Sequence, residues 1–208
     1  MVPGRNCPLC PRLADFRALN RRRAPDSFNA PVPSFGGIEG RVLVVGLAPG
    51  LKGANRTGRP FTGDYAGHLL YGTLKKFGFA CGSYAEHPGD DLTLLDCRIS
   101  NAVRCVPPEN KPSPAEINTC RRFLEAELAA SRNLRAVVAL GATAHATLLT
   151  ALRIRKARYP FAHGAVHELP NGLVLADSYH CSRQNTNTGK LTSEMFESVF
   201  AEVRRRLG

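Results

Sequence analysis

The sequence predicts one three-layer α/β/α domain, spanning residues 1–208, with a central and mostly parallel sheet. Short apolar runs that fit buried strands alternate along the chain with segments whose apolar residues recur at helical spacing. Strands that alternate with helices are typical of parallel sheets covered on both faces. At 208 residues with 43% hydrophobic content, the chain is long enough for one domain with a sizeable core.

Residues 1–40 predict a segment that wraps around the domain. They are rich in Pro, Arg and Cys, and only residues 13–22 have the composition of a short helix. The apolar run at residues 41–46 then predicts the first buried strand of the sheet.

A glycine-rich loop follows this strand, and we expect the site to be organised around it. Its sequence, GLAPGLKGANRTGRPFTGDYAG, has neither strand alternation nor helical spacing. Loops of this length in compact domains are usually functional. Asp64 is its only carboxylate, and Phe61 supplies a flat apolar face. On these residues alone, the alternative is a plain connector with a solvated run of charge.

The later elements continue the alternation. Ser113 and Glu116, with Pro114 between them, form a capping box that marks the start of a helix. The other expected elements are a helix over 64–77, a strand over 92–103, a strand over 134–140, a helix over 141–152, a hairpin of strands over 163–169 and 173–179, and a helix over 193–207. Ligands of such sheets bind at the carboxyl ends of the strands, so we expect the polar segments after the first, second and last strands to meet there.

The charge of the chain favours a polyanionic partner. Lys and Arg number 28 against 17 Asp and Glu, which gives a net charge of +11. We expect nucleic acid as the partner, and added solubility is the alternative explanation. The N-terminus has no apolar signal region and no apolar run is long enough to span a bilayer, so we expect a cytoplasmic protein with no membrane partner.

Four of the seven cysteines have a spacing that fits one metal centre. Cys7 and Cys10 form a C-x-x-C pair, Cys105 follows the second strand, and Cys120 lies on the inward face of the capped helix. Spacing leaves zinc and iron–sulfur both open. In the alternative reading, Cys120 is a core thiol and Cys105 is incidental. The remaining cysteines have no partner at ligand spacing.

Several motifs together resemble the family 5 uracil-DNA glycosylases, with family 4 as the near relative. They are GLAPG, NRTGRPFTGD, RISNAVRC, the four cysteines and SYHCSRQNTNTGKLT, in matching order from Cys7 to Phe196. The resemblance implies a uracil-DNA glycosylase-like fold. It also implies a structural [4Fe–4S] cluster held by Cys7, Cys10, Cys105 and Cys120.

The same resemblance implies a base-excision repair enzyme that flips uracil out of DNA and hydrolyses its N-glycosidic bond, leaving an abasic site. The family's tolerance of hypoxanthine, xanthine and some modified pyrimidines implies a broad substrate range. We expect a monofunctional enzyme that acts as a monomer at the nucleoid. The alternative from another class is a non-catalytic iron–sulfur or zinc protein that binds nucleic acid or senses oxidants.

The chemistry of this reaction assigns roles to individual side chains. Positive charge develops on the sugar and negative charge on the departing base, so a site needs an anion near the first and donors near the second. Asp64 is the expected anion, and His180 is expected to bind the base carbonyl oxygen. Asn101 suits the edge of a uracil, and Phe61 suits its face. Backbone groups of Leu47, Ala48 and Gly50 are expected to line the pocket.

The expected DNA contacts come from two segments. They are Arg59 in the glycine-rich loop and, after the last strand, Ser182, Arg183, Gln184 and Asn185. The sequence also departs from the family pattern, with Cys181 where proline is usual and Tyr65 where a smaller residue is common. The histidines outside the motifs are expected to be structural: His68, His87, His145, His163 and His167.

Overall fold

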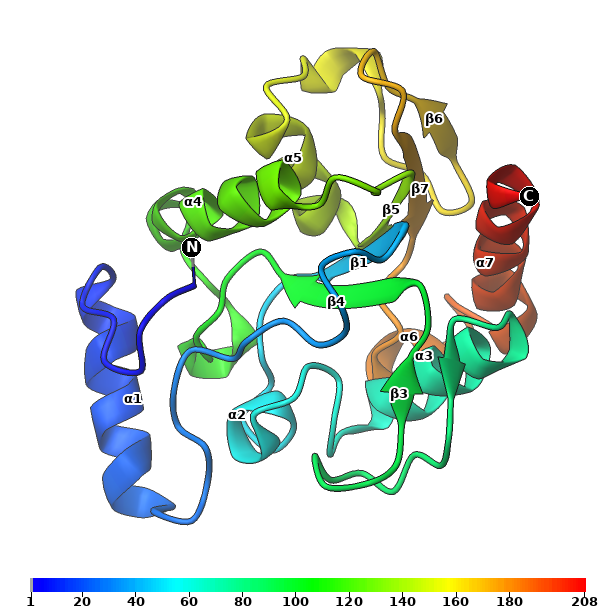
Figure 1. Ribbon diagram of the computed structural model, residues 1–208. Helices are drawn as coiled ribbons and strands as arrows, with labels where there is room; N and C mark the ends of the chain where they lie inside the picture. Colours follow the sequence, from blue (N-terminus) through cyan, green and yellow to red (C-terminus); the bar gives the residue numbers. More distant parts are fainter. Residues whose placement is uncertain (1) are drawn as a thin grey trace.

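The computed structural model describes residues 2–208 and confirms the predicted three-layer α/β fold (Figure 1). A five-stranded sheet has the order β4-β1-β5-β7-β6. Its four neighbouring strands β4, β1, β5 and β7 are parallel, and β6 pairs antiparallel with β7 as the predicted hairpin. The strands are β1(Val42–Gly46), β4(Cys97–Asn101), β5(Ala136–Leu140), β6(Val166–Glu168) and β7(Val174–Ser178).

Seven α-helices connect or cover these strands within the described residues. They are α1(Pro11–Arg23), α2(Ala54–Thr57), α3(Tyr65–Lys76), α4(Pro114–Ala130), α5(Ala142–Ala151), α6(Arg183–Asn187) and α7(Ser193–Leu207). Short 3-10 helices lie at Pro108–Asn110 and Lys156–Arg158. The short α2 and α6 were not predicted, and each lies in a polar segment that follows a strand.

Two apolar layers sandwich the sheet. In β1, Val42 and Val44 face the layer formed with α3 and α7, whereas Leu43 and Val45 face the layer formed with α4 and α5. Figure 1 shows the sheet between these two pairs of helices. The alternation explains why β1 is buried on both sides, as parallel strands covered by helices are.

The N-terminal segment runs along the outer edge of the sheet. The Val32 N–H donates to the Arg104 carbonyl over 2.7 Å, and Phe35 forms an antiparallel bridge with Ile99 of β4. At the other end of this segment, Leu13 of α1 packs with Phe123 of α4. These contacts cover the edge strand β4, which would otherwise present unpaired backbone groups.

The predicted continuous strand over residues 92–103 is wrong. The chain instead forms β3(Thr93–Leu94), which pairs antiparallel with β2(Ala80–Cys81) in a separate small sheet, and then β4. Asp96 separates the two strands because it has a left-handed backbone with φ of 53°. Its carboxylate accepts hydrogen bonds from the backbone and side chain of Arg41, at 2.8 and 2.6 Å. A long-range partner therefore fixes a turn inside an apolar run.

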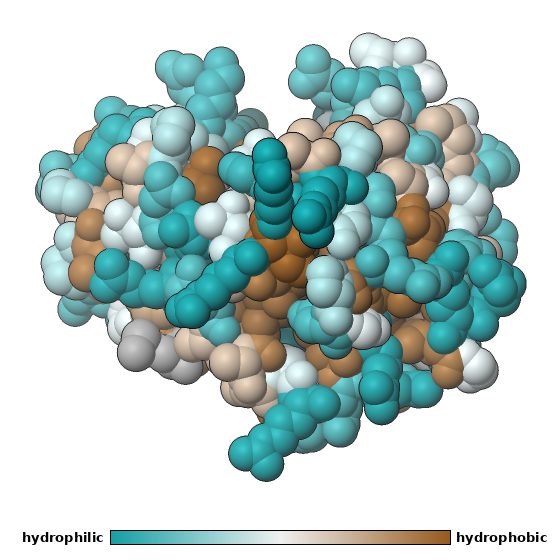
Figure 2. Space-filling model, turned by 90° about the horizontal axis from the view of Figure 1, so that it is seen from above, coloured by the Kyte–Doolittle hydropathy of each residue, from teal (hydrophilic) through white to brown (hydrophobic). Residues whose placement is uncertain are grey.

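No helix within residues 2–208 is long and apolar enough to cross a membrane. Viewed from the top of Figure 1, the surface is mostly hydrophilic, and long hydrophilic side chains project over a central apolar hollow (Figure 2).

The capping box of α4 gives a direct test of the local structure. The Ser113 hydroxyl accepts from the Glu116 N–H at 3.2 Å, and the Glu116 carboxylate accepts from the Ser113 N–H at 2.7 Å. We expect Ser113→Ala to lower the free energy of unfolding by about 1 kcal/mol, measured by urea denaturation. Ser198→Ala, the same change on the exposed side of α7, serves as control and should be nearly neutral. Equal losses in the two variants would contradict the capping role.

Candidate active site

The carboxyl ends of β1 and β4 bring Asn101 and Phe61 together. Gly46, the last residue of β1, is in register with Asn101 of β4. A Cβ atom on Gly46 would lie 2.6 Å from Asn101 Oδ1 and 2.7 Å from an atom of the Phe61 ring. Only glycine leaves room for both side chains, so this position determines that an amide and an aromatic ring share one space at the edge of the sheet.

His180 reaches the same place from β7. It lies two residues beyond the end of that strand, and its ring stacks on Phe61 with 5.7 Å between the ring centroids and an interplanar angle of 27°. Asn185 Nδ2 donates to the His180 carbonyl at 2.8 Å and so fixes the backbone that carries the imidazole. Desolvation lowers the pKa of His180 to about 4, and the ring is therefore neutral near pH 7.

Asp64 precedes the first residue of α3 and presents a carboxylate with an unpaired oxygen. Cβ atoms on Gly50 and Gly53 would lie 3.2 and 2.2 Å from Asp64 Oδ2, so two glycines of the loop accommodate this carboxylate. Asp64 Oδ1 is buried and has no hydrogen-bond partner among the described residues. Burial raises the pKa of the Asp64 carboxyl above its ordinary value. A buried acceptor without a partner is available to a water molecule or a ligand.

Two interactions, one electrostatic and one a cation–π contact, join the Asp64 segment to the segment that follows His180. Cys181 is fully buried, and burial together with the charge of Asp64 raises the pKa of its thiol. The Arg183 guanidinium lies 5.3 Å from the centroid of the Tyr65 ring, which is 39% exposed. Asp64, Asn101 and His180 therefore converge on one edge of the sheet, whereas Tyr65 lies at the surface.

The expected backbone lining belongs to the first turn of the glycine-rich loop. The Leu47 carbonyl accepts from the Val103 N–H at 2.9 Å, which continues the pairing of β1 and β4 beyond the strands. The N–H groups of Ala48 and Gly50 donate to no other described residue and remain available to a ligand.

The structure does not support the expected DNA contact of Arg59. Its side chain is buried and forms two hydrogen bonds with the carboxylate of Asp90, at 2.6 and 2.8 Å. The guanidinium also lies over the rings of Phe35, Tyr71 and Tyr84. Sequence could not reveal this because the partner lies 31 residues away in another loop. Arg59 therefore stabilises the interior of the glycine-rich loop.

Tyr84 and Tyr71 hold the same loop close to Phe61. The Tyr84 hydroxyl accepts from the Gly63 N–H and donates to the Phe61 carbonyl, both at 3.2 Å. The Tyr71 hydroxyl donates to the Pro60 carbonyl at 2.5 Å. Phe61 has a left-handed backbone with φ of 52°, which costs free energy in a bulky residue. These bonds maintain the conformation that aims its ring at Asn101.

The segment after His180 divides into internal and exposed residues. Ser182 caps α6 by accepting from the Asn185 N–H at 3.4 Å, and the Asn185 side chain holds the His180 carbonyl. Arg183 and Gln184 are exposed. Of the four expected DNA contacts in this segment, these two side chains are free to approach a phosphate backbone.

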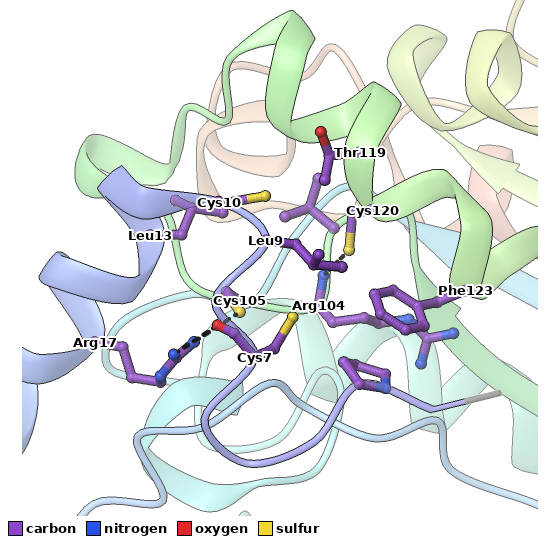
Figure 3. A pocket seen from close by; sticks show the side chains of 12 residues that line it. Cys7, Leu9, Cys10, Leu13, Arg17, Arg104, Cys105, Thr119, Cys120 and Phe123 are labelled. Carbon is purple, nitrogen blue, oxygen red and sulfur yellow. Dashed lines mark hydrogen bonds between the residues drawn. The ribbon is translucent and has the colours of Figure 1, made fainter.

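The four cysteines expected to bind metal line one apolar pocket (Figure 3). Cys7 and Cys10 come from the N-terminal segment, Cys105 follows β4, and Cys120 lies on α4. Figure 3 shows their sulfur atoms around a common space. Burial, together with the charges of Cys120, Glu116 and Cys7, raises the pKa of the Cys10 thiol to about 11.

The hydrogen bonds to the sulfur atoms and the distances between these atoms indicate which metal group the pocket suits. The Arg104 N–H donates to Cys120 Sγ at 3.3 Å, and Arg17 donates to Cys105 Sγ at 3.5 Å. Among the described residues, the only group of at least three candidate ligands within 4.8 Å of one another consists of histidines and an aspartate, so no three of these sulfurs lie that close. One tetrahedral zinc ion with Zn–S bonds of about 2.3 Å would hold its sulfurs about 3.8 Å apart.

The sequence did not indicate that Asp90 and Tyr84 hold the glycine-rich loop in place through their hydrogen bonds with Arg59 and Phe61. Asp90 and Tyr84 lie in a polar segment between β2 and β3, where nothing in the local pattern marks them. The sequence did identify Gly46 as the last residue of a strand. A glycine at the end of a buried strand indicates that other groups pack closely against the backbone at that position.

Comparison with known proteins identifies relatives over nearly the whole chain. Residues 33–204 match the family model of the uracil DNA glycosylase superfamily. A type-5 uracil-DNA glycosylase of Thermus thermophilus is 48% identical over 207 residues, covering 97% of this chain and 94% of the relative. One from Mycobacterium leprae is 41% identical over 210 residues, covering 97% and 92%. A type-4 uracil-DNA glycosylase of Thermotoga maritima is 37% identical over 110 residues, covering 52% and 49%.

The buried pair of Arg59 and Asp90 should be essential to the stability of the loop. We expect Asp90→Asn to lower the free energy of unfolding by about 3–5 kcal/mol, because it leaves a buried guanidinium without its counter-charge. Glu125→Gln, which breaks the exposed pair with Arg121, is the matched control and should cost less than about 1 kcal/mol. Chemical denaturation measures both.

The ion pair of Arg59 and Asp90 also predicts how the free energy of unfolding depends on pH. Its hydrogen bonds to Arg59 lower the pKa of Asp90 to about 2, below the ordinary value of about 3.9. Its contribution to stability is therefore complete above the ordinary value and is lost as the pH falls towards 2. Asp90→Asn should flatten the stability profile between these values, and an unchanged profile would contradict the assignment.

Proposed function

The chain belongs to the uracil-DNA glycosylase superfamily and removes uracil from DNA by hydrolysing an N-glycosyl bond, and we propose that Asp64 and His180 carry this reaction. The observation that supports the proposal is the convergence of a carboxylate, an amide, an imidazole and an aromatic ring at one edge of the sheet.

In the proposed mechanism, Asp64 acts on the sugar side of the bond. As the bond between the sugar carbon and the base nitrogen breaks, positive charge develops on the sugar, and the carboxylate stabilises it. The unpaired Oδ1 atom also accepts a proton from the water molecule whose oxygen bonds to that carbon, and this proton then passes to the anionic base. Burial strengthens both interactions because little solvent screens the charge.

His180 acts on the base side. The departing base takes the electron pair of the broken bond, and negative charge accumulates on its carbonyl oxygen. A neutral imidazole donates one N–H to that oxygen, and the lowered pKa of His180 keeps the ring neutral near pH 7.

Asn101 and Phe61 bind the flipped base. The amide of Asn101 offers an acceptor and a donor to the edge of uracil, and the Phe61 ring packs against its face. The free N–H groups of Ala48 and Gly50 add donors from the backbone. Arg183 and Gln184 approach the phosphate backbone beside the flipped nucleotide.

We also propose that Cys7, Cys10, Cys105 and Cys120 hold a [4Fe–4S] cluster. Four cysteines in an apolar pocket, N–H donors aimed at two sulfurs, and sulfurs too widely spaced for a single zinc ion all support this donor set. The cluster would tie α1, the end of β4 and α4 together. Ala48 packs against this group of residues, so the cluster also supports the glycine-rich loop.

The substrate range extends beyond uracil in our proposal. Asn101 is the only side chain that this proposal assigns to the edge of the base, so hypoxanthine and xanthine would meet few unmatched groups. We also propose that the protein acts as a monomer. Because genomic DNA is the substrate, the protein would work at the nucleoid in the cytoplasm.

Replacement of the proposed carboxylate tests the mechanism. We expect Asp64→Asn to lower excision of uracil from an oligonucleotide by at least about 10²-fold, with unchanged DNA binding. Alkaline cleavage at abasic sites measures excision, and fluorescence anisotropy measures binding. Asp26→Asn, a change at an exposed position, serves as control. Undiminished excision by Asp64→Asn would exclude the mechanism, and no excision by the unaltered protein would favour a non-catalytic binding protein.

The proposed cluster predicts an optical signature. Purified protein should be brown, with a broad visible absorption band and about four iron atoms per chain. Cys120→Ser should lose the band and the iron, whereas Cys81→Ser, at an exposed position away from the pocket, should keep both. A colourless protein that contains zinc at this site would contradict the cluster.

A further inference from the structure

A second group of candidate ligands lies away from the cysteine pocket. His145 of α5, His167 of β6 and Asp177 of β7 each offer one ligand atom, and these atoms all lie within 4.8 Å of one another. Asp177 is fully buried and His145 is 4% exposed. The proposed reaction uses none of the three side chains.

Hydrogen bonding leaves two atoms of this group without partners. Asp177 Oδ2 and His167 Nε2 are both buried, lie 3.5 Å apart and form no hydrogen bond. Among the described residues, no Lys or Arg pairs with Asp177, whose only ionic neighbours are the two histidines. A buried carboxylate oxygen with no partner costs free energy, and it points to a cation that would complete the group.

A contact with the Tyr159 carbonyl orients the His145 ring towards Asp177. Its Nε2 atom lies 2.9 Å from the Tyr159 carbonyl and must carry a proton to donate to it. This contact directs Nδ1 at Asp177, which lies 2.7 Å away through Oδ1. A backbone carbonyl that fixes the ring of a metal-binding histidine is the usual outer-shell arrangement.

A proton alone does not satisfy the whole group. A proton between His145 Nδ1 and Asp177 Oδ1 pairs those two atoms but leaves Asp177 Oδ2 and His167 Nε2 unpaired. The 3.5 Å between these two atoms is close to the separation of about 3.3 Å between neighbouring ligands of a tetrahedral zinc ion with bonds of 2.0–2.1 Å. A metal ion bound by Asp177 Oδ2 and His167 Nε2 would give both unpaired atoms a partner.

We propose that His145, His167 and Asp177 bind one zinc ion, at a site separate from the cysteine pocket. Two imidazoles and a carboxylate suit zinc, and three protein ligands leave a fourth position for water. The rings of Phe161 and Tyr159 pack edge-on against the two histidines and limit access of bulk solvent. The ion would join α5 and the edge strand β6 to β7 just before His180, and we expect its removal to lower the stability of this part of the sheet.

Metal content measured on the intact iron-containing protein tests this site. We expect chelator-treated protein to take up one zinc ion per chain from zinc chloride, with unchanged iron and a raised melting temperature. His167→Gln and Asp177→Asn should each lower zinc affinity by at least about tenfold and leave the iron content unchanged. Calorimetric titration gives the affinity, and mass spectrometry of both elements in one sample gives the stoichiometry.

His163→Gln is the matched control. His163 lies beside the same strand, where it accepts from the Tyr179 N–H at 3.2 Å, but it is not one of the three ligands. This variant should bind zinc normally. Absence of zinc uptake by the unaltered protein, or equal uptake by His167→Gln, would overturn the proposal and leave a hydrogen-bonded group only. Because His167 lies on a short edge strand, its replacement tests the site even where Asp177→Asn fails to fold.

Discussion

The pairing of β1 with β4 is the constraint on which the rest of the site depends. It sets Gly46 beside Asn101, and the missing side chain at Gly46 lets the Asn101 amide and the Phe61 ring occupy one space. His180 stacks on that ring from a strand two positions further along the sheet. The parallel sheet thus brings together side chains that lie far apart in sequence, because the carboxyl ends of its strands share one edge.

Buried ion pairs hold the segments around this edge in place. Arg59 and Asp90 fasten the glycine-rich loop to the loop before β3. Behind β4, Glu127 of α4 binds both Arg98 and Arg104, at 2.5 and 2.6 Å. Ion pairs of this kind contribute little net stability relative to apolar packing. Removing one partner, however, lowers the free energy of unfolding strongly because the other charge stays buried and unpaired. The pairs therefore fix a single arrangement of these irregular segments. This arrangement keeps Phe61 in position despite its left-handed backbone conformation.

The two proposed metal sites lie towards opposite ends of the sheet. The cysteine pocket adjoins β4, the strand at one edge, and joins it to α1 and α4. The group of His145, His167 and Asp177 joins β7 to the other edge strand, β6, and to α5. The proposed active site lies at the carboxyl ends of β4, β1 and β7. Both sites, when occupied, would stabilise elements whose own apolar contacts are limited, because α1 buries few residues and β6 is only three residues long.

The sequence alone determined the alternation of strands and helices, the capping box of α4, and the three polar segments that carry Asp64, Asn101 and His180, because each is a local pattern of apolar spacing or turn chemistry. Only the tertiary structure decided that Arg59 is buried, that residues 92–103 divide at Asp96, and that histidines expected to be merely structural surround a buried carboxylate. Each of these depends on a partner at least 31 residues away, or on another strand of the sheet. No local periodicity encodes such a partner, because the fold itself selects it.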